Sequence, residues 1–367
     1  MLSRSFPSRI LFSVVFSCSL LYLFFSSYPT PASTSSSQPL IPKVKPQPFG
    51  GPASVHTISP TATPTPSSPA KASKPKSNNR CDALKKPDDI LVVLKTGANE
   101  VFEKLPTQIL TMLQCVEDLL IFSDLEQQLG AYHIHDALAD VNEAVKVGNP
   151  DFDYYRTLHE YKKIGQDIST LRETTGQAAW NLDKYKFMPM LEKTWEKKPN
   201  KKWYVFIEAD TYLVWTNLLL WLERLDPTEL IYLGSPTFIN NQEFGHGGSG
   251  VILSGTAMAK VFEGGPGVAA QYNLQTKDES IGDYMLMKAL KDKGVSFRSG
   301  WPMLQAEKPS TIPFGPGPDN GVRHWCQPIV TMHHITAGEA SAVWQYEQKR
   351  EDPMVRVSCP YHRGTSC

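Results

Sequence analysis

Short, uncharged runs of strand-forming residues recur from residue 90 onward, with helical patterns between them. The runs are ILVVL at 90–94, LLIF at 119–122, WYVFI at 203–207 and LIYLG at 230–234. Runs without polar alternation fit strands that are buried on both faces of a parallel sheet. The helical patterns cover 105–113, 151–172, 182–195 and 218–225. This alternation predicts an α/β fold with a mainly parallel central sheet and helices on both faces.

A different segment precedes this pattern. Residues 10–28 carry no charge and follow Arg4 and Arg9. As a helix they would span about 28 Å, enough to cross a bilayer core. Positive charges before such a helix keep the N-terminus in the cytosol. We therefore expect a cytosolic tail at 1–9 and a transmembrane signal-anchor at 10–28, in a single-pass type II topology. A cleaved signal peptide, which has the same charge pattern, is the alternative.

Composition separates the next segment from the rest of the chain. Residues 29–80 are rich in proline, serine and threonine, and Phe49 is their only aromatic residue. Such a segment buries too little apolar surface to offset chain entropy, which predicts a disordered stem before a folded part at 81–367. Residues 1–80 hold 8 of the 37 Lys and Arg and none of the 37 Asp and Glu, so 81–367 have a net charge of −8 (29 minus 37). That balance argues against a nucleic-acid partner bound through a basic surface.

Six cysteines constrain the expected lumenal part. Cys18 lies in the expected membrane helix, and the other five would face an oxidising compartment. An odd number leaves at least one cysteine free or paired between chains, which permits a homodimer. The pairs that we expect are Cys81–Cys115 and Cys359–Cys367.

Polar side chains follow three of the apolar runs. They are Lys95-Thr96, Ser123-Asp124 and Glu208-Ala209-Asp210. Ligands of open α/β sheets bind beyond the carboxyl ends of the strands, so these segments are candidates for a binding site. Two carboxylates at i and i+2 on a strand end can share a hard cation with phosphate oxygens. Acidic residues at strand ends are also common without any ligand.

Three further motifs follow along the chain. Residues 244–254 read FGHGGSGVILS, where glycines allow a backbone to approach a ligand closely before a strand begins. Gly282-Asp283 opens a helical pattern, and His333-His334 follows a short apolar run at 329–332. A flexible loop and a packed histidine are the simpler interpretations of the first and last motifs.

In their order and spacing, these motifs resemble glycosyltransferase family 31, the fringe and core 1 β1,3-galactosyltransferase group. The segments LKTGANEVFEKLP, LLIFSDLEQQLG, LDKYKFMPMLEKTWE and PIVTMHHIT are closest to its fungal branch. The resemblance covers residues 88–350. It implies a GT-A fold and an inverting, Mn²⁺-dependent transfer of a sugar, galactose or N-acetylglucosamine, in β1,3 linkage. The donor would be a UDP-sugar and the acceptor a glycan or glycoprotein, in a Golgi or ER–Golgi membrane.

The resemblance also implies roles for particular residues. The family's usual D-D-D-T motif reads Glu208-Ala209-Asp210-Thr211 here, so the middle acid is missing. Asp210 matches the direct metal ligand, and His333 matches the late histidine that completes the metal shell, with His334 as its alternate. Thr96, Asp124 and Glu208 would contact the nucleotide. Lys186, or Lys184 one turn away, would contact the diphosphate, and Gly247 and Gly248 would line the donor sugar.

An inverting transfer needs a general base for the acceptor hydroxyl. Asp278, Glu279 and Asp283 are the candidates in this part of the chain. On a helix Asp283 has Leu286 and Met287 beside it, and a carboxylate on an apolar face is costly unless it is satisfied or used. Matching GDYMLMKAL to the family's motif also selects Asp283. The competing hypothesis for the whole chain is a non-catalytic, membrane-tethered relative that binds a sugar nucleotide or a glycan.

Overall fold

The computed structural model describes residues 81, 87–312 and 327–350. The chain divides into two units, residues 1–72 and 73–367, and every described residue belongs to the second unit. The expected cytosolic tail, signal-anchor, stem and Cys359–Cys367 pair lie outside the described residues. Within the described ranges, no helix is both long enough and apolar enough to span a bilayer.

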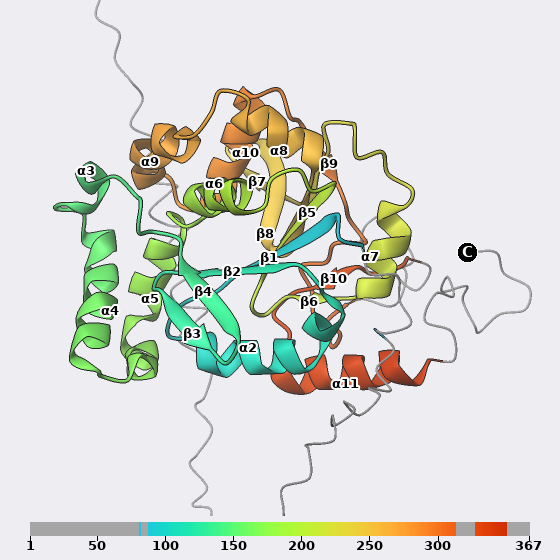
Figure 1. Ribbon diagram of the computed structural model, residues 1–367, viewed down its shortest axis with the longest axis horizontal. Helices are drawn as coiled ribbons and strands as arrows, with labels where there is room; N and C mark the ends of the chain where they lie inside the picture. The colour runs from blue at the N-terminus through green and yellow to red at the C-terminus, as the bar shows by residue number, and fades with distance from the viewer. Residues whose placement is uncertain (1–80, 82–86, 313–326, 351–367) are drawn as a thin grey trace, which may run out of the picture. The chain divides into compact units, whose positions relative to one another are not determined.

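An eight-stranded sheet forms the centre of the described unit (Figure 1). Its strands in spatial order are β3 (Gln127–Leu129), β4 (Tyr132–Asp136), β2 (Leu119–Ser123), β1 (Ile90–Lys95), β5 (Trp203–Glu208), β8 (Gln242–Ser254), β7 (Tyr232–Ile239) and β9 (Phe297–Ser299). Four of the seven neighbouring pairs are parallel, namely β4–β2, β2–β1, β1–β5 and β7–β9. The expected mixed α/β architecture with a large, mostly parallel sheet is therefore confirmed.

The sheet departs from the expected pattern at β8. This strand lies between β5 and β7 and is antiparallel to both. The glycine-rich motif, expected to precede a strand and with a flexible loop as the simpler interpretation, lies inside β8. Gly234 and Gly245 approach so closely across the β7–β8 pair that a Cβ on Gly234 would lie 2.5 Å from the Gly245 Cα. The glycines therefore permit a strand here, where side chains would force the backbones apart.

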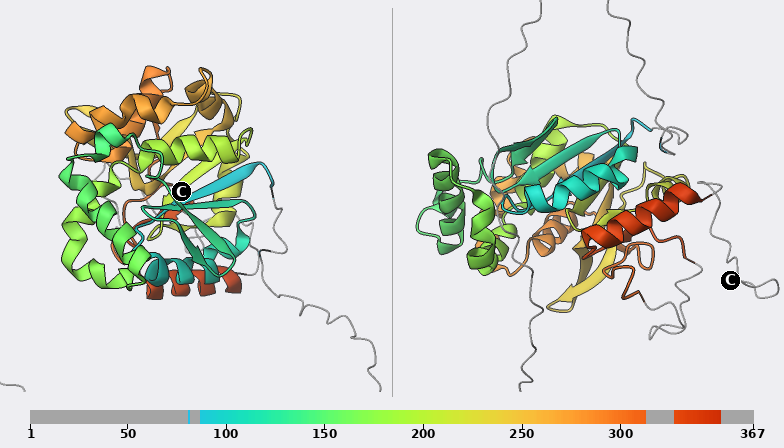
Figure 2. Two further views of the ribbon diagram at one scale, coloured as in Figure 1. Left: turned by 60° about the vertical axis from the view of Figure 1, so that its left-hand side comes forward. Right: turned by 90° about the horizontal axis from the view of Figure 1, so that it is seen from below.

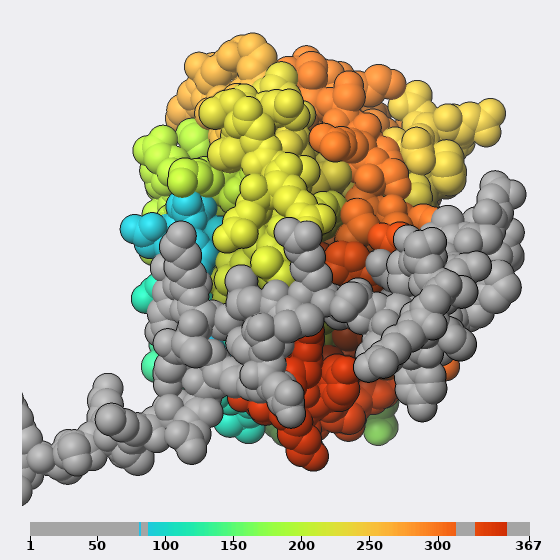
Figure 3. All heavy atoms as spheres, turned by 90° about the vertical axis from the view of Figure 1, so that its right-hand side faces the viewer, coloured from blue at the N-terminus to red at the C-terminus, as the bar shows by residue number. Residues whose placement is uncertain are grey.

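Alternate residues of the central strands face two different cores. On β1, Ile90, Val92 and Leu94 belong to one core, and Leu91 and Val93 to the other. Helices α2 (Val101–Leu110), α7 (Trp215–Leu222) and α11 (Ala337–Lys349) cover the first core, and α6 (Phe187–Lys197), α8 (Gly255–Phe262), α9 (Val268–Asp278) and α10 (Gly282–Asp292) cover the second. The two-residue period of a strand produces this division, and helices lie on both faces as expected (Figure 2). Figure 3 shows α7 at the surface in yellow, with α11 in red below it.

A third, smaller core lies under α4 (Asp153–Ile164) and α5 (Arg172–Asp183), near the short helix α3 (Glu143–Lys146). The helix expected at 151–172 ends at Gly165, which has a φ of 71° and caps α4 in the left-handed conformation. A second break at Lys184–Lys186 separates α5 from α6. The second break bears on the site described below, because Asp183 and Lys186 lie on either side of it.

The expected Cys81–Cys115 disulfide is confirmed. Both cysteines are buried in the first core. The bridge ties the residue at the start of the described part to the short 3-10 helix Met112–Cys115 that follows α2.

Candidate functional site

A two-stranded sheet brings together two residues that are far apart in the sequence. Strand β6 (Tyr212–Leu213) pairs antiparallel with β10 (Thr331–Met332), with Met332 opposite Tyr212. The pairing places His333 beside Asp210, and the Asp210 carbonyl accepts a hydrogen bond of 3.0 Å from the Ile335 backbone N–H. The convergence of these two predicted metal residues thus depends on a pairing only two residues long.

The side chains of Asp210, His333 and His334 form a candidate cation site. Asp210 Oδ1 lies 3.3 Å from His333 Nε2, and Asp210 Oδ2 lies 3.8 Å from His334 Nδ1. One ligand atom from each residue lies within 4.8 Å of the other two. His333 is buried and His334 is exposed, so the group reaches from the interior to solvent.

The electrostatics of this group favour an ionised carboxylate. Burial by itself would raise the pKa of Asp210, but the hydrogen bond with His333 and the Lys104 ammonium outweigh it and lower the pKa. Lys104 Nζ lies 3.2 Å from Asp210 Oδ2, whereas Oδ1 faces His333. Asp210 Oδ1 therefore faces His333 and is not engaged by Lys104.

The geometry fits a divalent cation. Ligands at right angles around a cation with bonds of about 2.1 Å lie about 3 Å apart, close to the 3.3 Å between Asp210 Oδ1 and His333 Nε2. A Cβ on Gly248 would lie 2.4 Å from His333 Nε2, so only glycine leaves room for the imidazole here. A carboxylate with imidazole nitrogens can hold a divalent transition-metal cation, Mn²⁺ and Zn²⁺ among them.

A cavity of about 540 Å³ opens beside this group, at the carboxyl ends of β1, β2 and β5. We call it the strand-end cavity. Seven of the predicted site residues line it: Asp124, Lys186, Glu208, Asp210, Gly248, Asp283 and His333. Its volume falls in the range of small-molecule sites.

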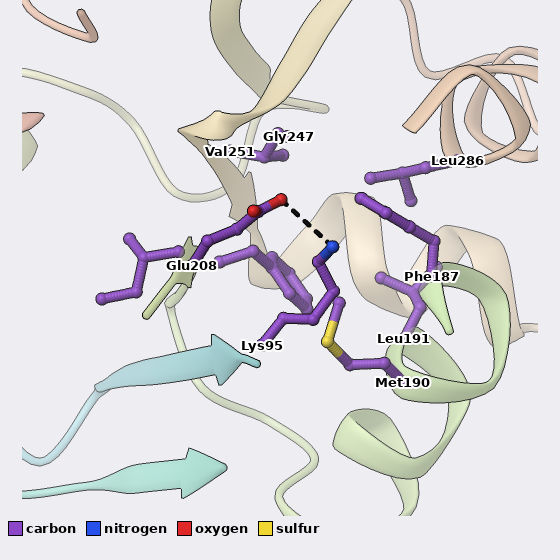
Figure 4. A pocket seen from close by; sticks show the side chains of 10 residues that line it. Lys95, Phe187, Met190, Leu191, Glu208, Gly247, Val251 and Leu286 are labelled. Carbon is purple, nitrogen blue, oxygen red and sulfur yellow. Dashed lines mark ion pairs between the residues drawn. The ribbon is translucent and has the colours of Figure 1, made fainter. Parts of the chain in front are cut away.

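Two buried lysines lie at the site: Lys186 lines the strand-end cavity, and Lys95 lies behind it beside the smaller cavity. Lys95 pairs with Asp183 and lies 3.1 Å from Glu208 Oε1 (Figure 4). Lys186 Nζ lies 2.9 Å from Asp183 Oδ1 and 3.5 Å from Asp124 Oδ2. Although burial lowers the pKa of a lysine, these carboxylates outweigh it and raise the pKa of both lysines. The network holds two positive and three negative charges.

The network gives Glu208 a different place from the one that the motif predicts. Its carboxylate pairs with Lys95, and it is not among the residues whose ligand atoms converge with those of Asp210. The two carboxylates of the Glu208-Ala209-Asp210 motif thus face different partners. The expectation that they share one cation is not met by this geometry.

Asp283 lies in the first turn of α10 and is 5% exposed. Its two oxygens accept hydrogen bonds of 2.9 Å from the backbone N–H groups of Gly247 and Tyr284. Burial raises the pKa of Asp283 to about 6. The negative charge of Glu208 also raises this pKa, whereas the two backbone hydrogen bonds lower it. A fixed carboxylate that titrates near neutral pH has the properties of a general base.

The competing candidates lie elsewhere. Asp278 is exposed at the end of α9, and Glu279 pairs with Lys288 at 3.1 Å. Neither lines the strand-end cavity, whereas Asp283 does. Lys184 also reaches the cavity wall, but its ammonium pairs with Asp151 at 3.1 Å.

Two predicted residues do not line the strand-end cavity. Thr96 is buried, and its carbonyl accepts a hydrogen bond of 3.0 Å from Lys186 Nζ. Gly247 adjoins a much smaller, mostly apolar cavity that contains the Lys95–Glu208 pair (Figure 4). A Cβ on Gly247 would lie 2.9 Å from the Phe187 ring, so this glycine supports the packing behind Asp283.

Three residues at the site were not assigned roles from the sequence. Asp183 joins both buried lysines, Lys104 pairs with Asp210, and His246 lines the strand-end cavity. The signal for Asp183 was its spacing, because it lies three residues before Lys186, one helical turn away. His246 stood inside the glycine-rich motif, and burial together with the nearby His333 lowers its pKa.

Comparison with known proteins gives no family. No family model matches this sequence, and no curated protein matches it either.

Proposed function

We propose that this chain is an inverting, metal-dependent glycosyltransferase with a GT-A-type fold that uses a UDP-sugar as donor. The observation that carries the proposal is one cavity with a cation group on one wall and a buried carboxylate on another. Asp210 and His333 supply the first, and Asp283 supplies the second. The order of motifs along the chain, which resembles glycosyltransferase family 31, supports the same reading.

In this proposal, different residues hold the cation and line the nucleotide part of the cavity. Asp210 and His333 would hold the divalent cation, with His334 within reach of the same position. A bound cation neutralises charge that develops on the diphosphate of the leaving UDP. Lys186 is already paired with two carboxylates, so it fixes the cavity floor and leaves little free charge for phosphate. Asp124 also lines the cavity, where its Oδ2 atom lies 3.5 Å from Lys186 Nζ and its Oδ1 atom accepts a hydrogen bond of 2.6 Å from the Ala98 backbone N–H, so it supports the cavity wall near the expected nucleotide position.

Asp283 would accept the proton in the transfer step. The acceptor hydroxyl oxygen forms a bond to the anomeric carbon as the bond from that carbon to the diphosphate oxygen breaks. UDP leaves with the electron pair, and the hydroxyl proton passes to the Asp283 carboxylate. The backbone N–H groups of Gly247 and Tyr284 hold that carboxylate in a fixed orientation.

A specific observation favours a second function, that of a non-catalytic binder of sugar nucleotides or glycans. Ala209 replaces an acid of the family motif, and Glu208 is engaged by Lys95 at 3.1 Å. These changes leave Asp210 as the single carboxylate of the cation group.

Donor turnover distinguishes the two functions. The full chain, purified in detergent, would be incubated with UDP-galactose, UDP-N-acetylglucosamine or other UDP-sugars, and UDP release would be measured with Mn²⁺ or EDTA. The proposal predicts Mn²⁺-dependent UDP release from at least one donor. UDP-sugar binding without any release, with or without glycan acceptors, would favour the non-catalytic function.

A further inference from the structure

A second group of possible metal ligands lies on an edge hairpin of the sheet. It consists of Glu126, His133 and His135, and one ligand atom from each lies within 4.8 Å of the other two. His133 and His135 are two residues apart on β4, so both side chains lie on one face of that strand. None of the three lines the strand-end cavity.

Strand register explains why the carboxylate meets both histidines. Strand β3 pairs antiparallel with β4, with Gln127 opposite Ile134 and Gln128 opposite His133. Continuing this register by one residue sets Glu126 opposite His135. Both imidazoles face the same carboxylate oxygen: His133 Nε2 bonds to Oε1 of Glu126, and His135 Nδ1 lies 3.8 Å from it.

Other contacts hold the group in place. The second carboxylate oxygen, Glu126 Oε2, accepts a hydrogen bond of 2.7 Å from the Asp136 backbone N–H. The His135 ring packs 5.5 Å from the Phe122 ring and 4.3 Å from the His133 ring, measured between centroids. One oxygen of Glu126 is thus anchored to the backbone, and the other remains directed at the two imidazoles.

We propose that Glu126, His133 and His135 bind Zn²⁺, at a site separate from the strand-end cavity. Two imidazole nitrogens and one carboxylate oxygen are a ligand set that zinc takes, with a fourth position left for water. Ligands of tetrahedral zinc with bonds of about 2.1 Å lie about 3.4 Å apart. The 3.8 Å between Glu126 and His135 is close to that separation, and the half-exposed His133 can move away from the carboxylate to admit the ion. Imidazole favours zinc over Mg²⁺ and Ca²⁺, which prefer oxygen ligands.

Zn²⁺ bound at this site would stabilise one edge of the sheet. Strand β3 is the last strand on its side, and it is only three residues long. A cation that joins the residue before β3 to two residues of β4 would fasten this hairpin, because an ion that binds only the folded form stabilises it.

The test measures Zn²⁺ binding to the full chain after metal removal, with Zn²⁺ alone as the probe and a competing chelator to set the free concentration. All variants carry His333→Gln, so that the cation group of the strand-end cavity does not contribute. His133→Gln and His135→Gln are then added separately. His159→Gln is the matched control, because His159 is a half-exposed histidine whose Nε2 lies 3.5 Å from Asp136 Oδ2 and which lies outside the group.

The proposal predicts that His133→Gln and His135→Gln each weaken the binding of one Zn²⁺ ion per chain by at least about 10–100-fold. That is the usual loss of metal affinity when only a hydrogen-bond partner of a ligand is removed, so the loss of a ligand itself should be no smaller. His159→Gln should leave the binding of that ion unchanged, and Zn²⁺ should raise the Tm of the control but not of the His135→Gln chain. Equal zinc affinity and equal Tm shifts in all three chains would overturn the proposal. Because UDP release uses the other cavity, His135→Gln in the chain with His333 intact should leave it unchanged. The two proposals therefore fail independently.

Discussion

Replacing Asp283 with asparagine should lower the rate of transfer and, separately, change how the free energy of unfolding depends on pH. Asparagine keeps the size of the side chain but accepts no proton, so transfer should fall by about 10²–10⁴-fold, the usual contribution of a positioned general base. UDP affinity should barely change, because Asp283 does not belong to the cation group.

The stability effect can be calculated from the burial of the carboxyl. Its pKa rises from the ordinary value of 3.8 to about 6 in the folded chain. Between these values the folded state holds a proton that the unfolded state has released, so Asp283 lowers stability as pH rises through this window. The difference is about 3 kcal/mol at about 1.4 kcal/mol per pKa unit. Asparagine has no such titration, although it loses one acceptor for the two backbone N–H groups.

The assay is urea unfolding of both chains between pH 4 and pH 7, alongside the rate of transfer against pH. Relative to the unmodified chain, the free energy of unfolding of Asp283→Asn should rise by about 2.4 kcal/mol from pH 4 to pH 7, because part of the titration lies below pH 4. The kcat/KM of the unmodified chain should fall on the acid side with a pKa of about 6. Asp278→Asn, at an exposed position outside the cavity, is the control and should change neither property. A stability difference that is constant with pH, or full activity in Asp283→Asn, would refute the reasoning.

Four further predictions concern the metal group, a glycine, the disulfide and the domain boundary. His333→Gln should abolish tight Mn²⁺ binding, measured by electron paramagnetic resonance, while the circular dichroism spectrum stays unchanged; an unaltered Mn²⁺ affinity would remove His333 from the site. Gly248→Ala should weaken Mn²⁺ binding because its Cβ would meet the His333 imidazole at 2.3–2.4 Å, whereas Gly338→Ala, with open space around it, should not. Cys115→Ser should lower the free energy of unfolding by about 4 kcal/mol, because the bridge closes a loop of 34 residues; a loss under 1 kcal/mol would contradict this. Residues 81–367, secreted into an oxidising compartment, should fold without residues 1–80, and aggregation of that fragment would show that the boundary is wrong.

The central strands could be predicted from sequence because burial on both faces leaves a simple pattern. The runs at 90–94, 119–122 and 203–207 correspond to β1, β2 and β5. β8 could not be predicted in the same way. Its first half is rich in glycine, and its antiparallel place between β5 and β7 depends on the close approach of Gly234 and Gly245. Pairing across a sheet is a tertiary property that no local pattern carries.

The candidate site was predicted in part. The rule that ligands bind beyond strand ends found Asp124, Glu208 and Asp210 from the sequence itself. His333 stood out after a short apolar run, but its role beside Asp210 came only from the resemblance, since 123 positions separate the two residues and a two-residue strand pair joins them. Asp183 was missed because its second partner, Lys95, lies 88 positions away on β1, and no local pattern carries that contact. The sequence showed only its spacing of three residues to Lys186.

The most direct test of the central claim is the affinity of UDP for the full chain, measured by calorimetry with Mn²⁺ and with EDTA. If Asp210 and His333 hold a cation that in turn binds the diphosphate, UDP should bind with Mn²⁺ and lose at least about 10-fold in affinity with EDTA. Such a loss corresponds to a coupling free energy of about 1.4 kcal/mol or more. The same loss should appear in Asp210→Asn when Mn²⁺ is present. Equal UDP affinity with Mn²⁺ and EDTA, or unchanged affinity in Asp210→Asn, would contradict the account.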